Sequence, residues 1–154
     1  MTQSAFDHAR YRWREVTGTD EDSYFVHHDY TILGHDLAAG TLDMVVRWGR
    51  DGGHCHKHRH TATTTVLVLE GEQHLRDVHP DGSLGEERVR RAGDYALTTA
   101  EALPHLECGG AKGGLAFFGC HSNDGKLYEI VDDHGKLVFD VTMETLLADF
   151  EANT

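Results

Sequence analysis

Short stretches in which apolar and polar side chains alternate run through most of the chain, and this period of two constrains the fold more than any other feature. The clearest example is Thr41–Trp48, where Leu42, Met44, Val46 and Trp48 share one face of an extended segment. Such alternation is typical of a β-strand with one buried face. Turns are abundant as well, because the chain has 17 glycines. We therefore predict an all-β fold built from many short strands.

The other strand candidates are short apolar or β-branched runs separated by turn residues. They are predicted at Tyr24–Val26, Tyr30–Leu33, Thr63–Leu69, Glu72–Val78, Glu87–Arg91, Tyr95–Thr98, Leu115–Cys120, Leu127–Val131 and Lys136–Val141. Glu70-Gly71 predicts a tight turn between two of these strands, and His79–Ser83 predicts a hairpin loop. Many short strands of this kind favour an antiparallel barrel or sandwich.

The two ends of the chain differ from this pattern. Apolar residues recur at helical spacing in Met143–Glu151, and Thr142 before them is a suitable N-cap, so one short C-terminal helix is predicted there. Residues 1–22 are polar, and we expect them to form an N-terminal arm. A chain of 154 residues is of single-domain size, so residues 23–154 are predicted to form one domain.

Charge and cysteine usage exclude several classes of function. The formal net charge is −12, which argues against binding to nucleic acids or to anionic membranes. The three cysteines have no regular spacing, so neither a disulfide framework nor a thiolate zinc site is predicted, and a reducing cytoplasmic location is expected. We see no apolar run long enough to span a bilayer and no signal-like N-terminus.

Histidine is the residue that needs a functional explanation. The chain has 13, and four of them alternate in the heptapeptide His54–His60. In an extended segment all four could line one side, which is how a strand presents two imidazoles to one metal ion. The alternative is a solvated run without function. A tight site needs a third ligand from elsewhere in the fold, and His105 is the best candidate, with His74 as a rival.

At this point the chain resembles the cupin superfamily. The segment His58-Arg59-His60, followed by Thr64 and Gly71, is similar to the first cupin motif, in which two histidines one residue apart precede a glutamate and a glycine. Gly93–Thr98 leading to His105 resembles the second motif. The resemblance implies a single-domain cupin, a small jelly-roll-like antiparallel β-barrel, with a metal held by His58, His60 and His105.

Thr64 stands where most metal-binding cupins carry glutamate, and this departure narrows the resemblance. The acetylacetone-cleaving dioxygenases also lack that glutamate and bind iron through three histidines, and the chain is similar to them in length, spacing and C-terminal segment. The 2,4′-dihydroxyacetophenone dioxygenases are a second similar group. The resemblance implies Fe²⁺ as the metal, with Zn²⁺ or Ni²⁺ as alternatives, and a homodimer.

Several side chains are expected around this metal. We place Thr64, Glu107 and Arg47 in catalytic-site roles, in which polar groups orient the imidazoles. Each of the two charged residues could instead be an ordinary surface charge. Apolar neighbours are predicted by strand parity at Val66 and Val68, with three further guesses at Met44, Val46 and Phe117. The remaining histidines are expected to be exposed, namely His8, His27, His28, His35, His79 and His134.

The function implied by the resemblance is a non-haem, metal-dependent dioxygenase. Its substrates would be dioxygen and a small β-diketone or hydroxyaryl ketone, which would bind as a bidentate enolate and be cleaved at a carbon–carbon bond. Three neutral imidazoles leave the full charge of the metal available to such an anion. The alternatives are a non-oxidative lyase or isomerase, a non-catalytic metal-binding sensor or carrier, and a metal buffer that uses His54 and His56.

Overall fold

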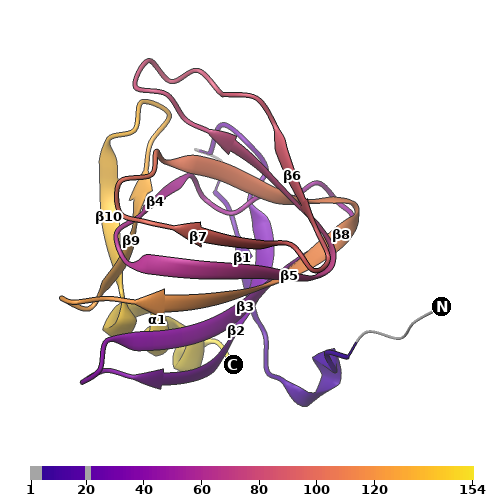
Figure 1. Ribbon diagram of the computed structural model, residues 1–154, viewed down its shortest axis with the longest axis vertical. Coiled ribbons are helices and arrows are strands. Elements are labelled where there is room, and N and C mark those ends of the chain that lie inside the picture. The colour runs from indigo at the N-terminus through magenta and orange to yellow at the C-terminus, as the bar shows by residue number, and fades with distance from the viewer. Residues whose placement is uncertain (1–4, 20–21) are drawn as a thin grey trace.

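The computed structural model describes residues 5–19 and 22–154, and strands account for most of them (Figure 1). Its elements in chain order are the 3-10 helix His8–Arg10, β1 (Arg14–Thr17), β2 (His27–Asp36), β3 (Thr41–Trp48), β4 (His58–His60), β5 (Thr63–Asp77), β6 (Arg88–Arg91), β7 (Tyr95–Thr98), β8 (His105–His121), β9 (Lys126–Val131), β10 (Leu137–Thr142) and α1 (Met143–Ala152). The predictions of an all-β chain and of one C-terminal helix are confirmed.

The strands form a curled antiparallel sheet. One path through it follows the order β1-β2-β3-β8-β4-β9-β10, while β5 pairs with β6, β7 and β8. The central strand is β8, which lies between β3 and β5 over much of its length (Figure 1). The curled sheet encloses the apolar core, and the predicted inward faces of β3, at Leu42 and Val46, are buried there.

The C-terminal helix closes one end of the sheet. Thr142 caps it as predicted, because its hydroxyl accepts a hydrogen bond from the Thr145 amide while the Thr145 hydroxyl accepts one from the Thr142 amide. Met143, Leu146 and Phe150 are buried against the core. Among the described residues, no helix combines the length and apolar character needed to cross a bilayer.

The predicted turn at Glu70-Gly71 is wrong, because the two strands expected on either side of it are one strand, β5. Irregular register occurs on both sides of Gly71 in the pairing of β5 with β8. Gly71 has φ +61°, and a β-carbon there would collide with the backbone carbonyl of Gly113 on β8. The glycine therefore allows a bulge within a paired strand instead of a reversal of the chain.

Two other expectations, on the N-terminal arm and on the four alternating histidines, are modified by the structure. Residues 1–4 and 20–21 of the predicted N-terminal arm lie outside the described residues, and Arg14–Thr17 of that arm is β1, which pairs with β2. The four alternating histidines do not share one strand, because only His58–His60 forms β4. His54 makes isolated bridges to Val26 and Cys108 instead.

Candidate metal centre

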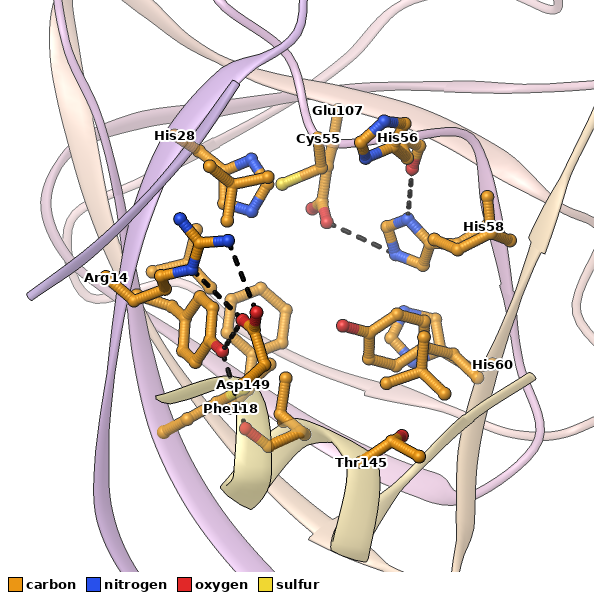
Figure 2. A pocket seen from close by; sticks show the side chains of 18 of the residues that line it. Arg14, His28, Cys55, His56, His58, His60, Glu107, Phe118, Thr145 and Asp149 are labelled. Atoms are coloured by element: carbon orange, nitrogen blue, oxygen red, sulfur yellow. Dashed lines mark hydrogen bonds and ion pairs between the residues drawn. The ribbon is translucent and has the colours of Figure 1, made fainter. Parts of the chain in front are cut away.

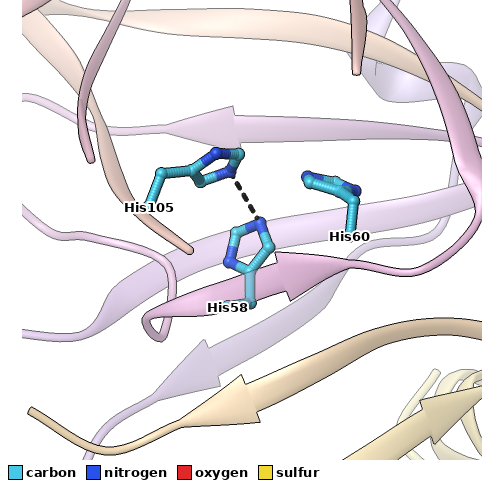
Figure 3. Close-up of side chains that lie close together, drawn as sticks. All are labelled: His58, His60 and His105. Carbon is cyan, nitrogen blue, oxygen red and sulfur yellow. Dashed lines mark hydrogen bonds between the residues drawn. The ribbon is translucent and has the colours of Figure 1, made fainter. Parts of the chain in front are cut away.

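Three histidines converge in the interior of the curled sheet (Figure 3). His58 and His60 lie two residues apart on β4, so their side chains point to the same side. His105 is the first residue of β8 and pairs directly with His58. The three side chains are buried and each offers a ring nitrogen within 4.8 Å of the other two. The sequence prediction that His58, His60 and His105 lie together is confirmed.

Hydrogen bonds on the outer nitrogens decide which nitrogen of two of these rings carries a proton. His58 Nδ1 donates to the backbone carbonyl of His56 at 2.7 Å, which leaves the lone pair on Nε2. The Thr64 hydroxyl donates to the Ala62 carbonyl at 3.0 Å and can therefore accept from His60 Nδ1 at 3.3 Å. His58 and His60 then present Nε2 lone pairs, the form that binds a metal.

The environment also favours neutral imidazoles. Burial lowers the pKa of His60 and of His105 well below the ordinary value, and the neighbouring His58 acts in the same direction. His58 Nε2 and His105 Nε2 approach to 3.0 Å, as Figure 3 shows. The donor set of three converging, buried imidazoles therefore fits a divalent transition metal.

A carboxylate lies beside the same nitrogens. Glu107 Oε1 is 3.3 Å from His58 Nε2 and 3.9 Å from His105 Nε2, and the side chain is buried. Its other oxygen accepts a hydrogen bond of 2.6 Å from Gln73 Nε2. Gln73 in turn accepts one of 3.2 Å from Arg90 Nη1. The prediction that Glu107 lies at the site thus agrees with its position in the structure.

The histidine cluster borders a cavity of about 300 Å³ (Figure 2). His58, His60 and Glu107 border one part of it, and its walls are mainly apolar, with Met44, Val46, Phe118, Ile130, Val141 and Leu146 among them. Arg14 and Asp149 form an ion pair on the opposite side. The cavity can therefore enclose a small, largely apolar molecule next to the imidazoles.

Solved structures with the same architecture exist, although no protein-family profile matches the sequence and no curated protein is significantly similar to it. An acetylacetone dioxygenase from Acinetobacter johnsonii superposes with a TM-score of 0.70 at 13% identity, covering 100% of this chain and 93% of the other. An RmlC-like cupin protein from Ralstonia eutropha JMP134 gives 0.68 at 16% identity, covering 99% and 87%. A cupin 2 conserved barrel domain protein from Rhodopseudomonas palustris gives 0.59 at 11%, covering 81% and 80%.

The chain has the cupin fold. The resemblance expected from the motif residues is thereby confirmed at the level of the fold, since identities this low show the architecture alone. Within the cupin barrel, Thr64 is fully buried at the position that the first motif predicts, where its hydroxyl contacts His60. A short neutral hydroxyl is a poor metal ligand, so Thr64 acts on the imidazole.

Arg47 is not brought to the metal centre of the cupin barrel. It alternates with the inward-facing Val46 on β3, so its side chain points to the other face of the sheet. There its Nε donates to Asp29 at 2.8 Å, and its guanidinium lies 3.9 Å from the centre of the Trp13 ring. Parity along β3 could have shown this, because Met44, Val46 and Trp48 already define the inward face.

One predicted apolar neighbour is on the wrong face. Phe118 lines the cavity and Phe117 does not, because β8 pairs with β3 in the register Met44↔Phe118 and directly paired residues share a face. Met44 and Val46 do line the cavity. Val66 and Val68 are buried as expected. The register between distant strands decided this point, and the local sequence around Phe117 carries no signal for it.

Sequence reasoning also missed one histidine that borders the cavity. His28 was expected to be exposed, but it lines the cavity, and burial lowers its pKa to about 3. His56 also lines the cavity, although it lies outside any strand. His74, the rival for the third ligand, has its Nδ1 3.1 Å from Glu87 on the face of β5 opposite Gln73. The position of His28 depends on the pairing of β2 with β1, which a polar local sequence does not reveal.

Proposed function

We propose that the protein is a non-haem, metal-dependent dioxygenase that cleaves a carbon–carbon bond of a small β-diketone or hydroxyaryl ketone. The observation that carries the proposal is the meeting of three buried, converging imidazoles with a mainly apolar cavity of about 300 Å³. An acetylacetone dioxygenase among the structures of similar fold supports the choice of substrate class.

The three imidazoles would hold the metal, and we propose Fe²⁺. Bound there, it would supply a Lewis acid that stabilises the enolate of the diketone and the redox activity that dioxygen chemistry requires. Three protein ligands would leave part of the metal's coordination shell available to the substrate, in the manner of other facial three-ligand sites. Zn²⁺ and Ni²⁺ are the alternatives that metal analysis must separate from Fe²⁺.

The chain's own residues orient and enclose the reactants. The His56 carbonyl and the Thr64 hydroxyl hold the rings of His58 and His60 in their metal-binding orientation. The apolar walls around Val46 and Phe118 exclude water and take up the hydrocarbon part of the ketone. Both atoms of dioxygen enter the products, which are a carboxylic acid and a dicarbonyl compound from a β-diketone and two carboxylic acids from a hydroxyaryl ketone. The overall reaction therefore needs no external reductant.

Oxygen consumption by the metal-loaded protein tests this function. The protein is reconstituted separately with Fe²⁺, Zn²⁺ and Ni²⁺ and supplied with acetylacetone, an aryl-substituted β-diketone and 2,4′-dihydroxyacetophenone. We expect the Fe²⁺ form to consume one dioxygen for each molecule of ketone cleaved, and the His58→Ala variant to be inactive. Turnover without oxygen would point to a lyase or isomerase. Zinc in the protein as isolated, with no turnover of any ketone, would point to a sensor or carrier.

The expected homodimer and the cytoplasmic location remain part of the proposal. Light scattering coupled to gel filtration measures the first directly, and fluorescence microscopy of a tagged protein measures the second. A monomer in solution would leave the reaction unchanged, because all the residues named at the centre come from one chain.

A further inference from the structure

Glu107 places a carboxylate beside the three imidazoles, and we propose that this carboxylate is a fourth ligand of the metal. Most metal-binding cupins have a glutamate at the position of Thr64, and this chain has a neutral hydroxyl there. Glu107 on β8 would supply the missing negative charge. The inference rests on the metal site of the proposed function but is independent of the reaction catalysed there. It changes the expected character of the centre, because a carboxylate lowers the net charge that three neutral imidazoles would leave on the metal.

The strand geometry brings two pairs of side chains together. His105 and Glu107 are two residues apart on β8 and point to the same side, just as His58 and His60 do on β4. β4 and β8 pair at His58↔His105, so the two pairs come from neighbouring strands. The two strands thus place Glu107 next to two of the three imidazoles, those of His58 and His105.

One carboxylate oxygen of Glu107, Oε1, lies close to the nitrogens of two imidazoles. This oxygen lies 3.3 Å from His58 Nε2 and 3.9 Å from His105 Nε2, which are themselves 3.0 Å apart. His58 donates from Nδ1 to the His56 carbonyl, so Nε2 is the nitrogen that faces the carboxylate. When Nε2 carries no proton, it and the carboxylate oxygen are two acceptors, which repel unless a cation lies between them.

One hydrogen on His58 Nε2 would face both Glu107 Oε1 and His105 Nε2, at 3.3 and 3.0 Å. A metal cation is the alternative, and His60, whose ring nitrogen lies within 4.8 Å of those of His58 and His105, can bind it as well. A metal cation accepts lone pairs from all of these atoms at once, which is why converging acceptors in a buried site favour it. The thiol of Cys55 also lies beside Glu107, but burial raises the pKa of that thiol well above its usual range, and a neutral thiol is only a weak donor.

The charge of Glu107 also needs compensation. The side chain is 2% exposed, and among the described residues no lysine or arginine forms an ion pair with it. Arg90 donates to Gln73, whose amide donates to Oε2, and the charge of Arg90 also acts on the carboxylate at longer range. An isolated carboxylate is costly to bury. The Gln73 amide therefore fixes one oxygen and leaves Oε1 directed at the imidazoles, where a divalent cation would balance its charge.

The test uses the Co²⁺ form of the whole protein without any substrate, so its result does not depend on dioxygenase activity. Glu107→Gln preserves the volume of the side chain and removes its charge. The control is Glu129→Gln, because Glu129 on β9 pairs with Arg59 and Lys126 away from the centre. Affinity is measured by competition with a chelator, and the ligand field by visible absorption of Co²⁺.

We expect Glu107→Gln to weaken Co²⁺ binding about 10- to 100-fold and to change the absorption spectrum, while Glu129→Gln alters neither. Formate added to Glu107→Ala should restore the spectrum, because it can occupy the place of the lost carboxylate. An unchanged spectrum in Glu107→Gln would overturn the proposal, since a carboxylate that only orients a ring leaves the ligand set intact.

Folding of each variant is checked by circular dichroism and thermal unfolding of the metal-free protein. If Glu107→Gln does not fold, the Co²⁺ absorption spectrum of Glu107→Asp tests the proposal instead. The aspartate side chain is one methylene shorter, so a carboxylate that binds the metal would move away from it and the ligand field would change. A spectrum identical to that of the unaltered protein would again overturn the proposal. Loss of Co²⁺ binding in His58→Ala establishes separately that the metal centre itself exists.

Discussion

Two groups of side chains in the described residues bring potential metal ligands within 4.8 Å of one another, and they differ in almost everything else. His58, His60 and His105 are 6%, 5% and 5% exposed. The second group, Glu15, His27 and Asp29, lies at the surface. Equal spacing of ligand atoms therefore does not make the two groups equivalent.

The difference lies in what can supply the positive charge. His27 contacts Asp51 through Nδ1 and Glu15 through Nε2, and these hydrogen bonds raise the pKa of His27. A proton on the imidazole then serves as the cation between the two carboxylates. Burial does the opposite to His60 and His105, because it lowers their pKa and keeps their nitrogens free. The exposed group around His27 therefore favours a bound proton, whereas burial makes the group of His58, His60 and His105 a candidate metal site.

Substitution of one histidine in each group should give the largest contrast. We expect His58→Ala to weaken Co²⁺ binding by at least about 100-fold, because two imidazoles do not make a tight site. His27→Ala should leave the affinity within about twofold, and His54→Ala should have a mild effect. Isothermal titration calorimetry measures all three. Equal losses in His58→Ala and His27→Ala would show that the comparison misidentifies the metal centre.

A smaller effect is expected at the hydroxyl that orients His60. Thr64→Val removes the acceptor of the His60 Nδ1 proton and should weaken Co²⁺ binding about tenfold. Thr65→Val is the matched control, because the neighbouring hydroxyl donates to Gly119 on the other face of β5. Chelator competition provides the measurement. Similar affinities in both variants would mean that Thr64 has no part in holding the imidazole.

The smallest effect is the pH dependence of the surface group. Because the pKa of His27 is raised above 6.5 by folding, its contribution to the free energy of unfolding is complete below about pH 6.5 and is lost as the pH rises through the folded pKa. The pKa of Asp51 is lowered below 3.8, so its contribution is present above that pH and is lost as the pH falls through the folded value. The pair is therefore most stabilising between these limits.

His27→Gln should consequently reduce the free energy of unfolding at pH 5.5 by less than about 1 kcal/mol, since the pair is partly exposed to solvent. At pH well above the folded pKa of His27 the difference from the unaltered protein should shrink. Urea unfolding at pH 5.5 and pH 9 measures both values. A difference that stays constant across this range would contradict the assignment of a proton to the surface group.

Much of the local structure was predictable, because short-range patterns determine it. Alternation in Thr41–Trp48 and the short run Tyr95–Thr98 after a turn predicted two strands with their observed ends, and the cap at Thr142 predicted the start of α1. The failure at Gly71 has a tertiary cause. Its positive φ suits a turn or a bulge equally well, and only the pairing of β5 with β8 along both sides of Gly71 selects the bulge.

The residues of the candidate site also fall into two sets, those that local sequence could predict and those that only the tertiary structure places. The sequence by itself determined that His58 and His60 point to one side, because alternation in an extended segment is a local property, and the motif resemblance identified His105. Only the tertiary structure decided that Arg47 faces away, that Phe118 rather than Phe117 lines the cavity, and that Glu107 meets the imidazoles. The physical reason is register: a strand shifted by one residue turns every side chain to the other face, and register is set by pairing between distant strands and by their bulges.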